Sequence, residues 1–330
     1  MKVKNQSTGE TFTPILDVLD VRGRKYTRQV KAECAELTSK LSYGDTREEY
    51  NRLKGVLIPK STIHSFTQEL APVMLQACLT LPLTQPGRLV ILADGTEVRS
   101  IKKGEFNQVH VAINVNPKGK QLFNLTVNQP YRRTPKRSIL ISDGEPSLKD
   151  QPAWRHQLCI LHASKRLMFA LWRERVSKEE REHLKTELDR ILYTLVNSTR
   201  KHEEDGDHEA LRRRIRSTLK ELSALAVTLK REGYREAGEH ISKNGRLLVT
   251  FAQLALEGIR IPYTTNQIER LMGEIAKRCK HQWAHWSERG LRSILTLILI
   301  HYTNPTLYEV YWQNYIHHRP LTTPQLTTQT

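Results

Sequence analysis

The chain has 330 residues, which is enough for two or three domains with a hydrophobic core, so its folding requires no disulfide or metal staple. Lys and Arg exceed Asp and Glu by 52 − 35 = 17, and this excess makes a polyanion the natural partner. The longest aliphatic run, at residues 294–300, is too short to span a membrane, and four scattered cysteines offer no disulfide framework, so we expect a cytoplasmic protein with no membrane partner.

The amino-terminal part of the chain predicts a small helical unit. Residues 1–30 show little periodicity, so we assign them no fold and treat them as a leader that could belong to a truncated domain. Residues 31–85 predict three helices, of which the second begins at Asp45 and the third runs from Thr62 to Leu70. This pattern is typical of a helix-turn-helix that reads the major groove, although three-helix units that bind nothing look similar. The residues expected on the outer, DNA-contacting side of the third helix are Thr62, His64, Ser65 and Gln68.

Strand patterns follow from residue 88 onward. Residues 88–95 read as a short buried strand that ends in Asp94-Gly95, and residues 137–146 repeat this arrangement with Asp143-Gly144. Between them, residues 107–115 and 120–127 alternate in polarity and predict a hairpin. We therefore expect Asp94 and Asp143 at equivalent ends of two strands of one sheet.

The rest of the chain is mainly helical. Residues 164–258 carry apolar stripes at helical spacing and predict a large all-α insertion. A closing helix from Ser287 is apolar enough to be buried, and residues 304–330 form a carboxyl-terminal tail.

The stretch YTTNQIER at residues 263–270 places a carboxylate, Glu269, at the start of a basic helix. One interpretation is structural, because Asn266 and Glu269 have the spacing of a capping box. The other is catalytic, because Asp94, Asp143 and Glu269 would together supply oxygen ligands for hard divalent cations. Two such ions can activate water and stabilise the leaving oxygen in phosphodiester displacement. The two roles are compatible.

Taken in order, ILADG, ILISDG, CILH and TTNQIER resemble the DDE signature of Mutator-like transposases, in particular their prokaryotic insertion-sequence branch. The resemblance covers roughly residues 31–300. It implies an α/β ribonuclease-H-like mixed sheet flanked by helices, discontinuous over residues 86–163 and 259–303, with the insertion at residues 164–258. It also implies that Asp94, Asp143 and Glu269 hold two Mg²⁺ ions, replaceable by Mn²⁺. The implied activity is hydrolysis at transposon ends and strand transfer into target DNA, by a homodimer or larger assembly at the nucleoid.

The CILH stretch supplies Cys159 and His162 in a C-x-x-H pattern. Three interpretations stay open: a role beside the metal ligands, which would extend to Asn266; packing at a strand-to-helix junction; and half of a zinc site. Cys279 with His281 or His285 would complete the zinc site.

The basic helix and the segment after it interleave cations with aromatic rings, which predicts phosphate contacts and base stacking. A core position is the alternative for at least one of the two tryptophans. The candidate DNA-binding residues are Arg270, Lys277, Arg278, Lys280, His281, Trp283 and Trp286.

Only eleven residues, 128–138, separate the hairpin from the strand at Ile139, and they include Pro130 and Pro135. We therefore expect the first helix of a ribonuclease-H-like core to be shortened or lost. This departure keeps a second interpretation open, a sequence-specific DNA-binding protein without catalytic activity. A nuclease or resolvase on the same core is a third.

Overall fold

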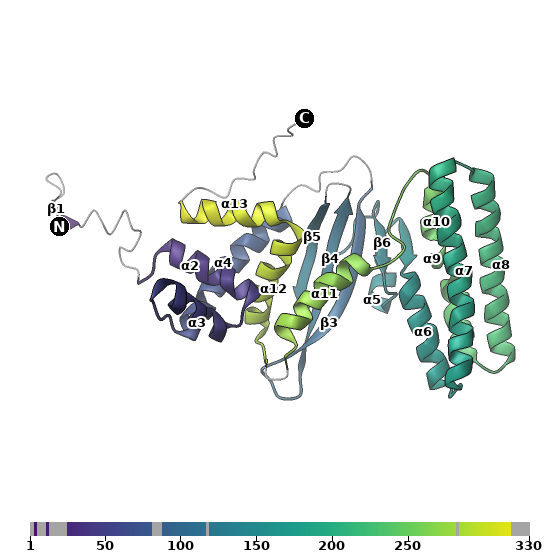
Figure 1. Cartoon of the computed structure of the whole chain (residues 1–330), viewed down its shortest axis with the longest axis horizontal. Coiled ribbons are helices and arrows are strands. Elements are labelled where there is room, and N and C mark those ends of the chain that lie inside the picture. The colour runs from purple at the N-terminus through teal and green to yellow at the C-terminus, as the bar shows by residue number, and fades with distance from the viewer. Residues whose placement is uncertain are drawn as a thin grey trace. The chain divides into compact units, whose positions relative to one another are not determined.

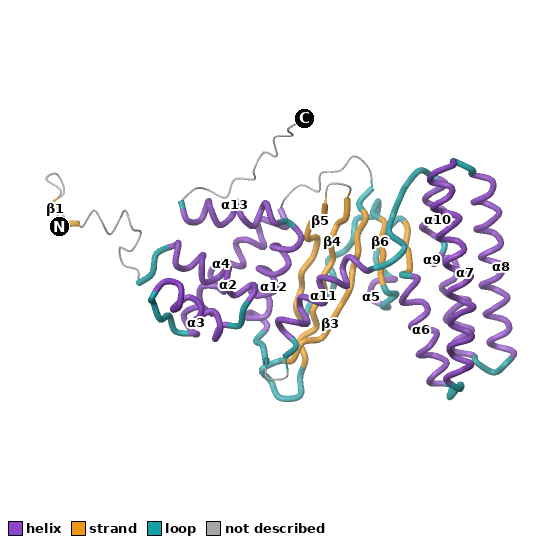
Figure 2. The backbone as a smooth tube through the Cα atoms, in the orientation of Figure 1, coloured by secondary structure: helices purple, strands orange, loops and turns teal. Residues whose placement is uncertain are grey.

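The computed structural model of the chain describes Val3–Lys4, Thr11–Phe12 and residues 25–80, 88–116, 119–281 and 284–317. These residues form a mixed α/β protein, in which a five-stranded mixed sheet is flanked by helices (Figure 1). Helices account for most of the described chain (Figure 2). Most of the leader expected at residues 1–30 and the end of the tail, residues 318–330, lie outside the described residues. Within the tail, the structure has a helix, α13 (Pro305–Ile316).

The main sheet has the strand order β5-β4-β3-β6-β7. The strands are β3 (Val90–Arg99), β4 (Phe106–Asn116), β5 (Gly119–Val127), β6 (Ile139–Ser142) and β7 (Arg155–Leu158). Strand β6 pairs in parallel with both β3 and β7. Two further short strands, β1 (Val3–Lys4) and β2 (Thr11–Phe12), pair antiparallel in a separate sheet.

The central strands are apolar because they are covered on both faces. All four residues of β6 are buried, which is usual for a parallel strand between two layers. Residues of β3, β4, β5 and β6 share one core cluster, to which Ile91, Ala112, Phe123 and Leu140 belong. The predicted hairpin is present as the neighbouring strands β4 and β5.

One strand differs from its prediction. Strand β3 does not end at Asp94-Gly95 but continues to Arg99. Its parallel pairing with β6 does end there, because Ala93 and Ser142 are the last paired residues. Asp94 therefore lies within a long strand, at the point where its parallel neighbour stops.

Three helices form the amino-terminal part: α2 (Arg28–Lys40), α3 (Tyr43–Lys54) and α4 (Lys60–Thr80). Cys34, Tyr50, Ile63 and Phe66 pack together between them. Helix α3 begins two residues before the predicted Asp45, because the Ser42 hydroxyl accepts a hydrogen bond from the Asp45 N–H and caps the helix. Helix α4 is 21 residues long and passes through Pro72, so the predicted short helix ending at Leu70 is wrong.

Helix α12 (Glu288–Thr303) begins after Ser287, as predicted, and is almost entirely buried. It packs against α2 and α4, and α13 packs on α2, α4 and α12. The tertiary contacts explain why α4 continues through a proline, since packing of an amphipathic helix outweighs the loss of one backbone hydrogen bond.

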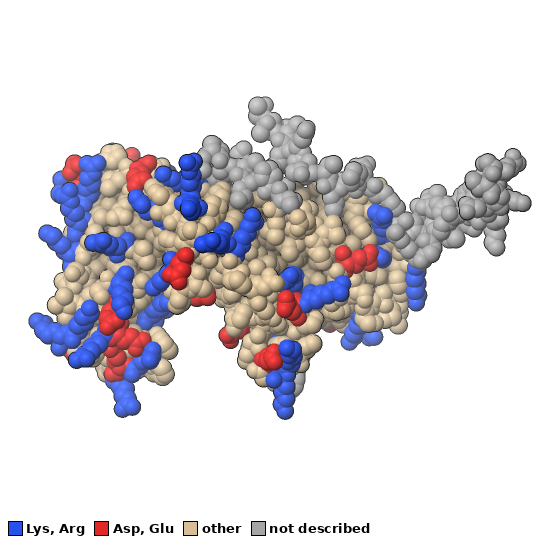
Figure 3. All heavy atoms as spheres, turned by 180° about the vertical axis from the view of Figure 1, so that it is seen from behind, with Lys and Arg blue, Asp and Glu red and all other residues tan. Residues whose placement is uncertain are grey.

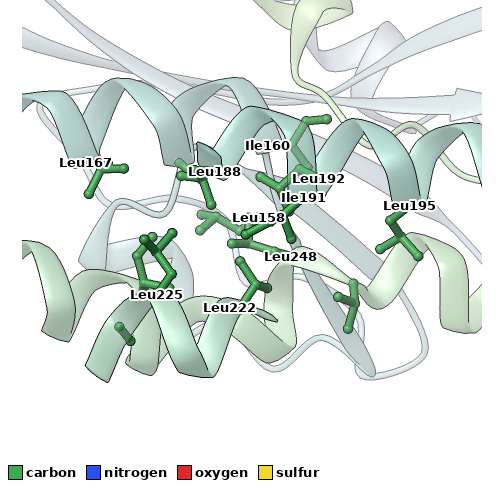
Figure 4. Packing of buried hydrophobic residues seen from close by; sticks show 14 of the residues in the cluster. Leu158, Ile160, Leu167, Leu188, Ile191, Leu192, Leu195, Leu222, Leu225 and Leu248 are labelled. Atoms are coloured by element: carbon green, nitrogen blue, oxygen red, sulfur yellow. The ribbon is translucent and has the colours of Figure 1, made fainter. Parts of the chain in front are cut away.

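The predicted helical insertion is present as α7 (Lys178–Asp205), α8 (His208–Arg231), α9 (Arg235–Leu248) and α10 (Thr250–Leu256). It is preceded by α5 (Pro146–Lys149) and by α6 (Ile160–Arg173), which starts four residues earlier than the expected boundary at 164. Helices α6 to α10 share one core with the end of β7, as the side chains of Leu158, Leu167, Leu188 and Leu222 show (Figure 4).

The chain divides into two compact units. One consists of residues 1–82, 97–109 and 273–330, and the other of residues 83–96 and 110–272. Lys and Arg side chains project from much of the face shown in Figure 3, with fewer Asp and Glu among them. Among the described residues, we find no helix with the length and hydrophobicity needed to cross a membrane.

Candidate functional site

The register of β3 and β6 brings two acids together. Ala93 pairs with Ser142, and Asp94 and Asp143 follow these residues directly. Because the two strands run in parallel, their next residues leave the ladder at the same edge of the sheet. The two acids therefore have equivalent positions in the register, although only Asp143 follows the end of its strand, since β3 continues to Arg99.

The third acid, Glu269, lies on α11 (Asn266–Cys279) and acts electrostatically on the same place. Burial raises the pKa of Asp94 to about 6, and the negative charges of Asp143 and Glu269 raise it as well. The Gly95 N–H, which donates to Asp94 Oδ1 at 2.8 Å, and His162 act in the opposite direction. Asp94 therefore lies within electrostatic range of both other acids.

Asp143 is held by a cation and by its own turn. Arg166 of α6 donates from Nη2 to Asp143 Oδ2 at 2.8 Å and from Nη1 to the Gly144 carbonyl at 3.0 Å. The Glu145 N–H donates to Asp143 Oδ1 at 2.9 Å. Gly144 has a φ of 90°, and a Cβ there would lie 2.5 Å from Leu158 Cδ1, so only glycine fits this turn.

A second group of side chains adjoins the acids. Ligand atoms of Cys159, His162 and Glu269 lie within 4.8 Å of one another. Cys159 is the residue before α6 and His162 lies in the first turn of that helix, so the i, i+3 spacing places both on one side. His162 Nδ1 is 3.6 Å from Glu269 Oε1.

Thr265 connects the members of this group. Its hydroxyl donates to Glu269 Oε1 at 2.7 Å and lies 3.3 Å from His162 Nδ1, and its N–H donates to Cys159 Sγ at 3.4 Å. Thr265 is fully buried, whereas Asn266 is the exposed first residue of α11. The capping-box spacing pointed to Asn266, but the residue that contacts Glu269 is its neighbour.

Cys159 and His162 shift each other's proton affinity. Burial would raise the pKa of the Cys159 thiol, but hydrogen bonds from His162 and Thr265 outweigh it and lower that pKa. The same hydrogen bond to Cys159 raises the pKa of His162 against the effect of burial, and the charge of Glu269 adds to this rise. The hydrogen bond thus lowers the pKa of Cys159 and raises that of His162.

Sequence patterns missed further residues beside Asp94. A Cβ on Gly95 would lie 3.1 Å from the Tyr131 hydroxyl and 3.2 Å from Glu145 Oε2, so both groups surround this part of β3. The Tyr131 hydroxyl lies 3.5 Å from Glu145 Oε2, and its ring stacks on His110 with centroids 4.2 Å apart. Glu145 was detectable as the acid two residues after Asp143, whereas Arg166, Tyr131 and His110 carried no local signal.

Two of the residues expected to read DNA lie against another helix. Gly290 of α12 approaches α4 so closely that a Cβ there would be 3.1 Å from His64 Nε2 and 3.8 Å from Gln68 Nε2. His64 and Gln68 also bond to each other at 3.1 Å. Helix α12 thus lies against these two side chains, which are half-buried. Thr62 is half-buried and Ser65 is exposed.

The basic segment divides into covered and exposed residues. Trp286 is only 7% exposed and donates its indole N–H to the Cys279 carbonyl at 3.1 Å, which matches the core alternative. Arg278 lies between the rings of Tyr43 and Trp286, at 5.6 Å from each centroid. Base stacking by Trp286 is therefore excluded in this structure, because its ring is buried.

The remaining candidates of this segment are exposed: Arg270, Lys277, Lys280 and His281. Lys277 forms an ion pair with Glu274 at 2.7 Å. Trp283 lies outside the described residues. Cys279 is fully buried and burial raises its pKa to about 12, so its thiol does not favour the metal-binding form.

The geometry thus consists of Asp94 and Asp143 at one edge of the sheet and of a group formed by Cys159, His162 and Glu269, whose Glu269 acts electrostatically on Asp94. The chain matches no model of a protein family, and a search of curated proteins finds no match.

Proposed function

We propose that the protein is a metal-dependent DNA transposase of the DDE type. The observation that carries this proposal is that Asp94 and Asp143 follow the last paired residues of two parallel strands, where the charge of Glu269 from a distant helix also acts on Asp94. Separate acids that meet at the end of a parallel ladder, in a strongly basic chain, suit phosphodiester chemistry on a polyanion.

The fold supports a ribonuclease-H-like core. A hairpin, β4 with β5, lies beside β3, and the parallel strands β6 and β7 follow on the other side of it. This order places the first and fourth strands of the core next to each other, and with them Asp94 and Asp143. The helices α2, α3 and α4 are the proposed helix-turn-helix, with Thr62, His64, Ser65 and Gln68 as its candidate contacts.

The acids fit Mg²⁺, which prefers oxygen ligands, and Mn²⁺ in its place. Burial chiefly raises the pKa of Asp94 to about 6, so it is mostly ionised at neutral pH, and a bound cation would stabilise that ionised form. Asp94, Asp143 and Glu269 would hold the metal. When bound, such ions supply an activated water and stabilise the leaving oxygen.

Two residues beside the acids would help them act on DNA, one as a cation and one as a hydrogen-bond donor. Arg166 neutralises Asp143 and is 37% exposed, so it is placed to contact a phosphate as well. Thr265 orients the carboxylate of Glu269 through its hydroxyl. The assembly expected for such an enzyme is a dimer or larger complex on paired DNA ends at the nucleoid.

The test is cleavage of end-labelled DNA taken from the sequences that flank the gene, with Mg²⁺ or Mn²⁺. Changes beside metal ligands typically cost about 10- to 100-fold, so we expect Asp94→Asn, Asp143→Asn and Glu269→Gln each to lower the cleavage rate at least about 100-fold. Glu182→Gln, an exposed acid on α7, should leave the rate unchanged. Equal activity of the three variants and the wild type would overturn the proposal.

A second candidate function is sequence-specific DNA binding without catalysis. The observation that favours it is the connection from β5 to β6, since residues 128–138 contain no helix, as the two prolines predicted. Tight binding of the flanking DNA, with no cleavage in Mg²⁺ or Mn²⁺, would select this function over the first.

A further inference from the structure

Three side chains with different ligand chemistry meet beside the acid pair. Cys159, His162 and Glu269 each offer one ligand atom, and these atoms lie within 4.8 Å of one another. Around a tetrahedral ion with metal–ligand distances of about 2.0–2.3 Å, ligand atoms are roughly 3.3–3.8 Å apart. His162 Nδ1 and Glu269 Oε1 already lie 3.6 Å apart, so small side-chain rotations would bring the set to this geometry.

The burial pattern fits an ion better than a covalent reaction. Cys159 is 0% exposed, which denies a large substrate access to its sulfur. The side chains of His162 and Glu269 are 21% and 31% exposed, so an ion can enter past them. Metal sites with three protein ligands and one open position have this arrangement.

The surroundings of the group are those of a preformed site. The Thr265 N–H donates to Cys159 Sγ at 3.4 Å, a contact that stabilises a thiolate, and the Thr265 hydroxyl donates to Glu269 Oε1 at 2.7 Å. One turn of α6 and the start of α11 therefore present the ligands together.

We propose that Cys159, His162 and Glu269 bind one Zn²⁺ ion, with the fourth position open to solvent. A thiolate with an imidazole selects a borderline-soft metal such as Zn²⁺ over Mg²⁺, which prefers oxygen. This partner set differs from the one expected with Cys279, because Glu269 completes the C-x-x-H pair. Glu269 is also one of the three acids assigned to Mg²⁺, so Zn²⁺ would inhibit cleavage; this consequence rests on the proposed function, whereas the binding does not.

The binding is tested by titrating the reduced, metal-free full chain with Co²⁺, a spectroscopic substitute for Zn²⁺. A Co²⁺–thiolate bond gives an intense near-ultraviolet charge-transfer band. We expect this band at one equivalent in the wild type and its disappearance when Zn²⁺ is added. Cys159→Ala should abolish it, and Glu269→Gln should weaken Co²⁺ binding at least about 10-fold, since even residues behind the ligands have effects of that size.

Two control variants keep the result specific. Cys34→Ala removes another buried thiol and should retain the band. Asp94→Asn should also retain it while losing cleavage, which separates the zinc site from the proposed activity. Absence of the band in folded wild-type protein, or its persistence in Cys159→Ala, would overturn the inference whether or not the protein cleaves DNA. With cleavage established, Cys159→Ala should need at least about 10-fold more Zn²⁺ for inhibition.

Discussion

Asp94 shows at the scale of a single residue how a candidate catalytic group opposes stability. It lies in a partly buried position with two other acids near it, and its pKa rises from 3.8 to about 6. Functional residues often lower the stability of the fold in this way, because a site that binds a cation holds like charges together, and these repel one another when no ligand is bound.

The pH dependence follows from the direction of this shift. The folded state binds the Asp94 proton more tightly than the unfolded state, so this residue favours folding below about pH 4 and loses that contribution as pH rises through about 6. The full difference is about 3 kcal/mol. Asp94→Asn stays neutral and should raise the free energy of unfolding by up to about 3 kcal/mol at pH 8, with little effect near pH 4.

The measurement is urea unfolding of both proteins in chelator-treated buffer at the two pH values. Glu182→Gln, which removes an exposed acid, should leave the unfolding midpoint nearly unchanged at both. Identical midpoints for Asp94→Asn and wild type at the higher pH would show that Asp94 lacks the raised pKa.

Thr265 is the second residue whose role can be measured. Thr265→Val removes the hydroxyl that bonds Glu269 while keeping the shape, and we expect it to destabilise the fold by about 1 kcal/mol. It should also slow Mg²⁺-dependent cleavage, because Glu269 loses its orientation. Thr265→Ser restores the hydroxyl and should recover most of the rate in the same assay. A Val variant as active as wild type would exclude this positioning role.

At the scale of elements, the turn after β6 decides where Asp143 points. Its backbone needs a positive φ at Gly144, and Leu158 of β7 fills the space where a side chain would lie. The Asp-Gly pair is therefore required both by the turn and by the packing of the next strand. The Asp-Gly pair, which is a common turn sequence, is thus explained by tertiary packing as well as by the turn itself.

Two glycines allow the backbone strain of a positive φ to be compared with the steric overlap of an added side chain. Gly206, between α7 and α8, has a φ of 72° with nothing within 4 Å of a Cβ. Gly206→Ala should cost only backbone strain, about 1 kcal/mol. Gly144→Ala should cost at least about 1–3 kcal/mol more, because its Cβ overlaps Leu158. Equal thermal or urea stabilities of the two variants would contradict this account.

Helix α4 illustrates how an element's length and exposure depend on its neighbours. Its local pattern indicated a short helix with His64 and Gln68 outward. Packing on α2, α12 and α13 extends it through Pro72, and Gly290 allows α12 to approach those two side chains closely. Among the four predicted contacts of this helix, Ser65 is exposed, whereas Thr62, His64 and Gln68 are half-buried.

At the scale of the whole molecule, the charge of +17 predicts a salt-dependent affinity for DNA. If six or more phosphates are contacted, the affinity should fall roughly 10³-fold between about 50 and 200 mM salt. Fluorescence anisotropy with labelled duplex DNA measures this slope. Arg270→Ala, which removes an exposed cation near Glu269, should reduce the slope by about one. An affinity independent of salt would exclude a phosphate-binding surface.

The sequence alone determined the features that depend on local periodicity and turn chemistry. These are the buried strands, the equivalent positions of Asp94 and Asp143, the closing helix after Ser287 and the missing helix at residues 128–138. Each of these features follows from a pattern a few residues long. The alternation of apolar residues reports which faces of an element are buried, and proline disfavours a helix at its own position.

Only the tertiary structure decided which distant segments meet. Glu269 lies 269 − 143 = 126 residues after Asp143, yet its charge acts on Asp94 and its carboxylate completes the group of Cys159 and His162. Tertiary packing also decides three other features: the hydrogen bond from Thr265 to Glu269, the ion pair of Arg166 with Asp143, and the burial of Trp286. The physical reason is that contacts between remote segments depend on how whole elements pack, and packing leaves no period in the sequence.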